Sequence, residues 1–322
     1  MLLMAMVAML MIFAVACGSK SGGNEPVQQP KAEDQTPVQE EVPTERTITY
    51  LGETYTVPGK VERIVVTGAM EVLEDSLVLD VHPVGASTVG GVFPEIYAAV
   101  TDQATSIGEK REPNLEAILQ LKPDVILGTT KFPAETVEKL EKIAPTILVS
   151  HLAEEWQDGL KLLGELTGKE DQVQQHIDAY ETDLEKSKEA LVEKLADKKV
   201  LAVRLRRGEV NVYPENIFVN PVLYNDLGLA VPEVVQAAKQ QQALSIEQFA
   251  EVNPDYLFIQ FAEEDNADAP NILQDLQNNP IVQNMKAFKE GNAFVNVIDP
   301  LCEGGPSYSR IKFLEAITEN IQ

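Results

Sequence analysis

Short apolar runs alternate along the chain with longer amphipathic stretches. The runs RIVVTGA (63–69), PTILVS (145–150), YLFIQF (256–261) and AFVNV (293–297) are each bounded by turn-forming residues. Runs of this length and composition are typical of buried strands, and the stretches between them carry helical periodicity. The pattern therefore predicts an α/β fold.

The chain also contains an internal repeat. NLEAILQLKPDVIL (114–127) and SIEQFAEVNPDYLF (245–258) share a polar first residue, a glutamate, an apolar helical pattern, Pro-Asp and two closing apolar positions. The spacing of the copies is constant, because 247 − 116 and 255 − 124 both equal 131. A capping residue before the helix and Pro-Asp after it indicate helix, turn and strand in each copy. The repeat predicts two lobes that are built alike.

A long amphipathic stretch, residues 170–199, separates the two copies. Its apolar side chains recur on one helical face, at Val173, Ile177, Tyr180, Leu184, Leu191 and Leu195. A single helix of this length spans roughly 40 Å at about 1.5 Å per residue. We therefore expect one long helix that braces both lobes and limits their opening and closing.

The N-terminus is a continuous apolar run, MLLMAMVAMLMIFAVAC, that ends in small residues before Cys17. The run fits the apolar region of a signal peptide, and Ala14-Val15-Ala16-Cys17 resembles the lipobox of a bacterial lipoprotein. This resemblance implies cleavage before Cys17 and a lipid on its thiol. The alternative is an uncleaved membrane anchor. In both cases we expect the protein at the extracytoplasmic face of the cell membrane.

These features divide the chain into five segments. Residues 1–16 are expected to form the signal peptide. Residues 17–45, rich in Gly, Ser, Pro, Gln and Glu, are expected to form the lipidated cysteine and a disordered tether. We expect the first α/β lobe over 46–152, a connecting helical segment over 153–198 and the second α/β lobe over 199–322.

The composition limits the classes of partner and chemistry. Acidic residues number 51 against 26 basic ones, and the formal net charge is −25. Phosphate binding needs a basic surface, so no nucleic-acid partner is expected. The cysteines Cys17 and Cys302 provide no disulfide framework. The histidines His82, His151 and His176 lack metal-ligand spacing, so no metal site of the protein is predicted. Common catalytic motifs are also missing, so we expect a binding protein without an intrinsic cofactor.

Arginines interrupt the apolar run KVLAVRLRRGEVNVYP, residues 199–214. Val203-Arg204-Leu205-Arg206 alternates apolar and basic residues, and successive side chains of a strand point to opposite faces. We therefore expect Val203 and Leu205 in a core, with the two guanidinium groups parallel on the other face at roughly 7 Å spacing. Such a pair fits an anion site. The alternative is a pair of edge-strand charges that discourage aggregation.

Taken together, these features resemble the class III substrate-binding proteins of ABC importers, which carry ferric siderophores, haem or cobalamin. The segments VVTGAMEVLEDSLVLDVHPVGA, IGEKREPNLE, TTKFP, VRLRRG, VYPE, LYNDLGL and QFAEEDNADAP are similar to the branch that binds iron-loaded tris-catecholates such as bacillibactin. The resemblance covers essentially the whole chain after residue 45. It implies two α/β lobes, joined by one long bracing helix, with the ligand between them.

The resemblance also implies the ligand-binding residues. The ligand would lie on five basic side chains, those of Lys110, Lys131, Arg204, Arg206 and Lys239. A ferric tris-catecholate is a trianion with aromatic faces, so it gains from charge attraction and from cation–π contacts with these groups. The iron would be coordinated by the siderophore and not by the protein.

Two glutamates of the repeat, Glu116 and Glu247, match family residues that dock each lobe onto an ABC permease. Their equivalent placement suits the two-fold symmetry of a permease dimer. The alternative is that each is a first-turn acid favoured by the helix dipole. The expected partners are thus a ferric catecholate siderophore and a permease dimer, with the binding protein itself monomeric. Ferric hydroxamate, haem or cobalamin binding, or a surface sensor that does not transport, remain as alternatives.

Overall fold

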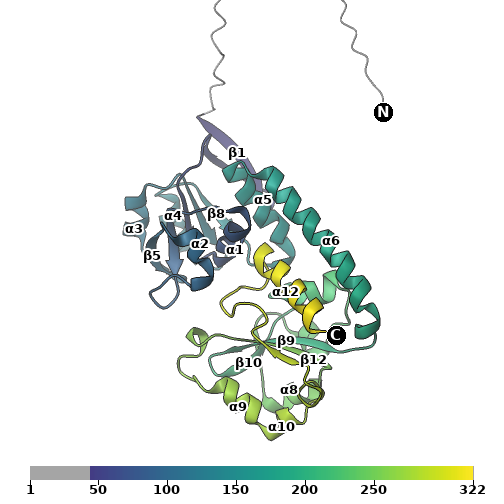
Figure 1. Ribbon diagram of the computed structural model, residues 1–322. Coiled ribbons are helices and arrows are strands. Elements are labelled where there is room, and N and C mark those ends of the chain that lie inside the picture. Colours follow the sequence, from purple (N-terminus) through teal and green to yellow (C-terminus); the bar gives the residue numbers. More distant parts are fainter. Residues whose placement is uncertain (1–43, 322) are drawn as a thin grey trace, which may run out of the picture. The chain divides into compact units, whose positions relative to one another are not determined.

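The computed structural model describes residues 44–321. The predicted signal peptide, the lipidation site Cys17 and most of the predicted tether therefore lie outside the described residues. Figure 1 shows an α/β architecture with two separate main sheets, each with helices packed around it. The predicted fold class is confirmed.

The first lobe is built on a six-stranded sheet that is parallel except for one edge strand. In spatial order its strands are β6 (Glu112–Pro113), β5 (Thr105–Glu109), β4 (Gly85–Thr88), β3 (Ile64–Thr67), β7 (Val125–Thr129) and β8 (Thr146–Val149). Successive residues of β3 point into different cores. Val65 packs in one apolar cluster, whereas Ile64 and Val66 pack in the other. Both faces of the sheet are therefore buried around β3, β7 and β8, which explains why these strands are apolar runs.

Helices and one hairpin complete the first lobe and its connection to the second. They are the hairpin strands β1 (Glu45–Tyr50) and β2 (Glu53–Pro58), the helices α1 (Met70–Leu79), α2 (Ala98–Thr101), α3 (Leu115–Leu121), α4 (Ala134–Glu141), α5 (Trp156–Thr167) and α6 (Glu170–Leu195), and the short 3-10 turns η1 (Glu95–Tyr97) and η2 (Ala153–Glu155). The hairpin is tied to α5, because the Arg46 guanidinium donates to the Glu165 carbonyl at 2.7 Å.

The second lobe is built on a five-stranded mixed sheet. Its strands in spatial order are β11 (Gln242–Leu244), β10 (Glu209–Val212), β9 (Val200–Arg206), β12 (Tyr256–Phe261) and β13 (Ala293–Val295). Its helical elements are the π-helical turn η3 (Pro221–Asp226), the 3-10 turn η4 (Glu264–Asn266), and α7 (Glu233–Ala237), α8 (Ile246–Val252), α9 (Ile272–Asn278), α10 (Pro280–Gln283), α11 (Lys286–Glu290) and α12 (Ser307–Asn320). The lobes are similar but not identical, because β10 runs antiparallel to β9 whereas β4 runs parallel to β3.

The internal repeat forms the predicted helix, turn and strand in both lobes: α3 and β7 in the first, α8 and β12 in the second. The side chains of Asn114 and Ser245 cap the two helices, accepting backbone N–H groups at 3.1 and 3.2 Å. The Pro-Asp aspartates, Asp124 and Asp255, each accept a backbone N–H at 2.8 Å from the residue just before β3 or β9. Each repeat therefore joins its strand to the central strand of its own sheet.

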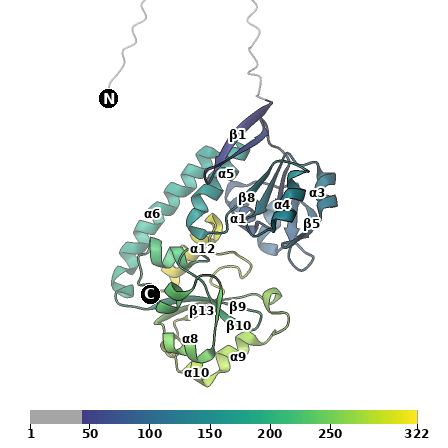
Figure 2. The ribbon, with the colours of Figure 1, turned by 180° about the vertical axis from the view of Figure 1, so that it is seen from behind.

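Helix α6 braces both cores, as its apolar face predicted. Val173 and Ile177 pack in the core of the first lobe, whereas Tyr180, Leu191 and Leu195 pack in the core of the second. Figure 2 shows this helix running past both sheets. Its opposite face is charged, and every helix within residues 44–321 is too short or too polar to cross a membrane.

The C-terminal helix, α12, does not stay within the second lobe. It packs against α1, α5 and α6 (Figure 1), and also against η3. The chain thus passes between the lobes a second time, and the segment before α12 reaches the first lobe. This return places Glu303 and the start of α12 beside α1.

Candidate functional site

A cavity of about 630 Å³ is lined by residues from both lobes. Four of the five predicted ligand-binding side chains line it, those of Lys110, Lys131, Arg204 and Arg206. Aromatic residues line it too, including Trp156 at the start of α5. A cavity of this size with a few converging charged groups fits a small-molecule ligand.

The two lysines enter the cavity from the carboxyl ends of strands of the first sheet. Lys110 follows β5, and its backbone N–H donates to the Thr88 carbonyl at 3.2 Å. Lys131 follows β7, and its N–H donates to the Thr129 hydroxyl at 3.3 Å. Gly68, after β3, keeps this region open, because its φ is +70° and a Cβ there would lie 2.8 Å from the Lys110 carbonyl oxygen. Ligands of open α/β sheets bind at this end of the strands.

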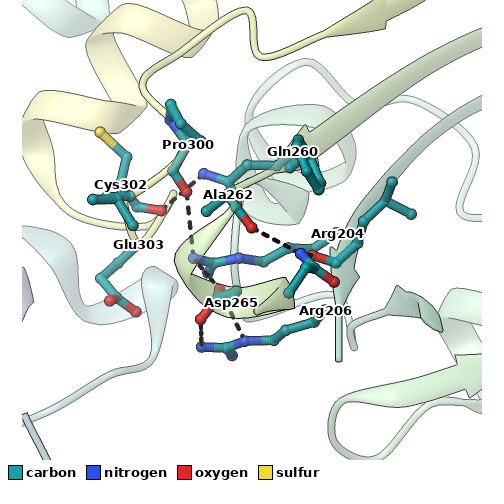
Figure 3. A network of polar contacts seen from close by, with 12 residues as sticks. Arg204, Arg206, Gln260, Ala262, Asp265, Pro300, Cys302 and Glu303 are labelled. Carbon is teal, nitrogen blue, oxygen red and sulfur yellow. Dashed lines mark hydrogen bonds and ion pairs between the residues drawn. The ribbon is translucent and has the colours of Figure 1, made fainter. Parts of the chain in front are cut away.

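The two arginines project from one face of β9, as their spacing predicted (Figure 3). Val203 and Leu205 point the other way and are buried in the core. Asp265, on η4, lies between the guanidinium groups, with its Oδ2 3.2 Å from Arg204 Nη2 and 3.1 Å from Arg206 Nε. β9 lies between β10 and β12, so the edge-strand alternative is wrong.

Carboxylates pair with the four predicted cations of the cavity, which the sequence did not indicate, whereas Arg111 also lines the cavity. Besides Asp265, Glu303 forms an ion pair with Lys110. Glu71 Oε1 lies 3.3 Å from Lys131 Nζ. The internal carboxylates satisfy the partly buried cations, because an unpaired charge in such a place is costly.

One sequence signal pointed to buried acids. Glu71, Glu74 and Asp75 lie at positions i, i+3 and i+4 of the apolar segment MEVLEDSLVL, so they share a helical face with core residues. All three are buried on α1. Asp265 and Glu303 had no comparable signal, because they lie in turns of polar or small residues far from their partners in sequence.

The charges of the cavity shift two carboxyl groups in opposite directions. Burial raises the pKa of Glu71 above its ordinary value, and the charge of Glu303 raises it further, while Lys131 and Lys110 oppose the shift. Burial also acts to raise the pKa of Glu303. The three surrounding cations, Lys110, Lys131 and Arg204, outweigh this effect and hold the pKa of Glu303 well below its ordinary value. Glu303 is therefore the firmly ionised member of the pair.

Glu74 and Asp75 join α1 to the segment around the start of α12. Glu74 Oε1 accepts the Glu303 N–H at 2.6 Å, and Oε2 accepts the Ser309 N–H at 3.1 Å. Asp75 Oδ1 accepts both the N–H and the hydroxyl of Ser307, at 3.2 and 2.5 Å. Burial raises the pKa of Glu74 to about 8 and that of Asp75 to about 7, although these hydrogen bonds oppose the shift. The contacts hold Glu303 at the cavity.

A second buried cluster surrounds Arg310 of α12. Its guanidinium forms an ion pair with Asp226 and donates to the Ala153 carbonyl at 2.6 Å. It also lies over the rings of Trp156 and Tyr180, 5.1 and 5.8 Å from their centroids. The cluster joins η2, α5, α6, η3 and α12 where the chain passes between the lobes, directly beside a wall of the cavity.

The fifth predicted ligand residue, Lys239, is exposed and does not line the cavity as the structure describes it. Its neighbours Gln240 and Gln241 do line it. Gln241 Oε1 accepts hydrogen bonds from Arg206 Nη1 at 3.3 Å and from the Tyr213 hydroxyl at 3.2 Å. The polar contact of this segment with the cavity therefore comes from the Gln241 amide and not from the predicted Lys239.

Glu116 and Glu247 are exposed at equivalent positions in the first turns of α3 and α8. Glu116 Oε1 accepts from the Gln120 amide at 3.5 Å. Hydrogen bonds from its own backbone N–H and from Ser245 hold the pKa of Glu247 below its ordinary value. Neither carboxylate forms a salt bridge within residues 44–321, so both are accessible to a cationic partner.

The three histidines and Cys302, which were assigned no ligand role, lie at different places in the fold. His151 lines the cavity, with Nδ1 3.1 Å from the Thr130 hydroxyl, whereas His82 and His176 lie elsewhere. Cys302 is buried and free, and burial raises the pKa of its thiol. Over residues 44–321, no group of three or more His, Cys, Asp or Glu side chains is arranged to hold a metal ion.

Residues 65–296 match the family described as periplasmic binding protein. The chain belongs to this family. Within the family, it is 42% identical over 316 residues to the iron-uptake system-binding protein of Bacillus subtilis, covering 98% of this chain and 96% of that one. It is 30% identical over 298 residues to the probable siderophore-binding lipoprotein YfiY of the same organism, covering 88% and 86%.

Solved structures of this family agree with the sequence relatives. The triscatecholate siderophore binding protein FeuA from Bacillus subtilis, complexed with ferri-bacillibactin, superposes with a TM-score of 0.83 at 44% identity, covering 86% of this chain and 98% of that one. The petrobactin-binding protein YclQ from the same organism matches in fold, with a TM-score of 0.74 at 20% identity over 86% of this chain and 99% of that one. The resemblance inferred from the sequence is confirmed.

Proposed function

We propose that this protein captures a ferric tris-catecholate siderophore, of the bacillibactin or enterobactin kind, and delivers it to an ABC permease. One observation carries the proposal: Lys110, Lys131, Arg204 and Arg206, contributed by both lobes, converge on one cavity. The related structure with ferri-bacillibactin supports the same ligand class. No covalent bond is made or broken in this function.

The charge and shape of the ligand suit this cavity. Ferric iron with three doubly deprotonated catecholates is a trianion. Two opposite unit charges 4 Å apart attract each other by about 4 kcal/mol at an effective dielectric constant of about 20. Guanidinium and ammonium groups also attract the faces of aromatic rings. The overall charge of −25 does not prevent capture, because exposed charges beyond about 8 Å are largely screened at physiological salt.

The ligand assignment is tested by titrating the protein with a ferric tris-catecholate and, separately, with a ferric hydroxamate. Trp156 lines the cavity and is the one tryptophan of the chain, so its fluorescence reports binding. The double variant Arg204→Ala, Arg206→Ala should weaken catecholate binding at least about a hundredfold, because two charge-assisted contacts are lost. The matched double variant Lys186→Ala, Lys188→Ala removes the same charge from the exposed face of α6 and should bind normally.

Three outcomes would contradict the assignment. The hydroxamate alone could bind, neither ligand could bind, or the arginine variant could bind like the parent chain. Titration with haem and with cobalamin would then decide among the remaining ligands of this family. A catecholate that binds but is not taken up by cells would instead indicate a surface sensor.

Further parts of the proposal concern partners and location. We propose that Lys239 moves to the ligand when it binds, and that Glu116 and Glu247 dock the two lobes onto a permease dimer. We also propose that Cys17 carries the lipid that anchors a monomer at the extracytoplasmic face of the membrane, without a cofactor of its own. The lipoprotein relative supports the anchor, and the equivalent exposed positions of the two glutamates support the docking role.

A further inference from the structure

Glu71 differs from the other carboxylates of the cavity in how it is satisfied. It lies on α1, lines the cavity, and its side chain is only 8% exposed. Oε1 contacts Lys131 Nζ at 3.3 Å, while Oε2 is buried with no hydrogen-bond partner among the described residues. A buried carboxylate oxygen without a donor is a costly arrangement unless that oxygen carries a proton when the site is in use.

The charge count of the cavity points in the same direction. The four predicted cations are paired with three carboxylates, those of Glu71, Asp265 and Glu303. Arg111, Asp75 and Glu155 also line the cavity, so with all these groups ionised the net charge is zero, as 5 − 5 = 0. A trianion then finds no excess of positive charge, and protonation of one carboxylate raises the net charge to +1.

Of the three carboxylates paired with these cations, Glu71 is the least stabilised by positive charge. Asp265 is held by two arginines, and the charge of Glu303 is stabilised by three cations. Glu71 contacts one lysine, whose side chain is 44% exposed and therefore free to turn toward a ligand.

Titratable groups face Glu71 from every neighbouring element. They are Glu74 and Asp75 on α1, Tyr97 on η1, Lys110 after β5, Lys131 after β7 and Glu303 before α12. The oxygens of Glu74 and the Oδ1 of Asp75 already accept hydrogen bonds from the segment around the start of α12. Burial and the neighbouring Glu303 charge raise the pKa of Glu71, so further negative charge in the cavity can protonate it at a modest cost.

We propose that Glu71 takes up one proton from solvent when an anionic ligand enters the cavity, and so releases Lys131 to contact that ligand. The proton is bound at Oε2, and the balance is site + ligand³⁻ + H⁺ → protonated complex. Glu71 thereby becomes a specificity-determining residue, since the uptake favours highly charged complexes over neutral ones. This inference rests on the proposed function.

The test measures protons as well as affinity. The full chain is titrated calorimetrically with a ferric tris-catecholate at pH 7.5, in two buffers that differ in ionisation enthalpy. We expect uptake approaching one proton per ligand, and an affinity that falls up to about tenfold for each unit of rising pH between 7 and 9. Glu71→Gln should remove the uptake and leave an affinity that changes less than about twofold over this range.

The control variant is Glu135→Gln, which neutralises an exposed glutamate paired with Lys139 on α4. It should keep the uptake of the parent chain. Any proton uptake by the ligand itself would persist in Glu71→Gln. The difference in proton uptake between the variant and the parent chain therefore measures the contribution of Glu71. The parent chain alone also decides the matter if the variant does not fold: binding without proton uptake overturns the inference. Failure to bind the catecholate at any pH would instead overturn the proposed function.

Discussion

Replacing Asp75 by asparagine removes a titrating group and keeps its hydrogen bonds. Both bonds from Ser307 end on Oδ1, and an asparagine oxygen at the same place would accept them. Glu74 is the matched comparison at the preceding position of α1. It uses both oxygens, for Glu303 N–H and Ser309 N–H, so Glu74→Gln must place an amide N–H against a backbone donor.

The magnitude follows from the pKa of Asp75, which burial raises from 3.8 to about 7. Between these values the folded state binds more protons than the unfolded state, so the free energy of unfolding falls as pH rises. A difference of one pH unit within this interval changes the free energy of unfolding by about 1.4 kcal/mol, so from pH 5 to 8.5 the contribution of Asp75 falls by about 3 kcal/mol. Glu74, with its pKa raised to about 8, adds a fall in the same direction.

Urea denaturation at pH 5, 7 and 8.5, followed by Trp156 fluorescence, measures these free energies. Asp75→Asn should be at least as stable as the parent chain at pH 5, and between pH 5 and pH 8.5 it should lose about 3 kcal/mol less than the parent. Glu74→Gln should be destabilised by about 1–3 kcal/mol at pH 5, because a buried donor loses its acceptor. The reasoning is refuted if Asp75→Asn keeps the pH dependence of the parent, or if it costs as much as Glu74→Gln at pH 5.

Two further predictions concern the junction of the lobes and the docking surface. Arg310→Met should lower the free energy of unfolding by about 3–5 kcal/mol in the same urea assay, because it leaves the mostly buried carboxylate of Asp226 without its ion-pair partner. The exposed change Lys312→Met should cost less than about 0.5 kcal/mol, and equal effects of the two changes would contradict this role of Arg310. Charge reversal at Glu116 and Glu247 should abolish siderophore uptake by cells. It should leave the ligand affinity within about twofold, because neither side chain lines the cavity. Unchanged uptake would rule out docking through these residues.

Local patterns predicted several main elements of this fold. The apolar face of residues 170–195 became α6, and the repeated Pro-Asp segments became α3 with β7 and α8 with β12. Period-two alternation placed Arg204 and Arg206 on one face of β9. Such patterns are reliable because they depend on the geometry of neighbouring residues along one helix or strand.

The internal counterions of the site could not be found in this way. Lys131 and Glu71 are separated by 60 residues, and Lys110 and Glu303 by 193. No local period connects such pairs. These pairs come together because the elements of the lobes pack against one another and because the chain returns to α1 before α12. The exclusion of Lys239 from the cavity lining, in favour of Gln240 and Gln241, likewise depends on how one turn packs.

The sequence by itself therefore determined the main apolar strands, the long helix α6, the repeat and the shared face of Arg204 and Arg206, since each depends on neighbouring side chains. The tertiary structure alone decided which carboxylate opposes each cation, and hence the net charge that a ligand meets. The physical reason is that burial and charge pairing depend on distances in space, and these are set only when the lobes, α6 and α12 pack together.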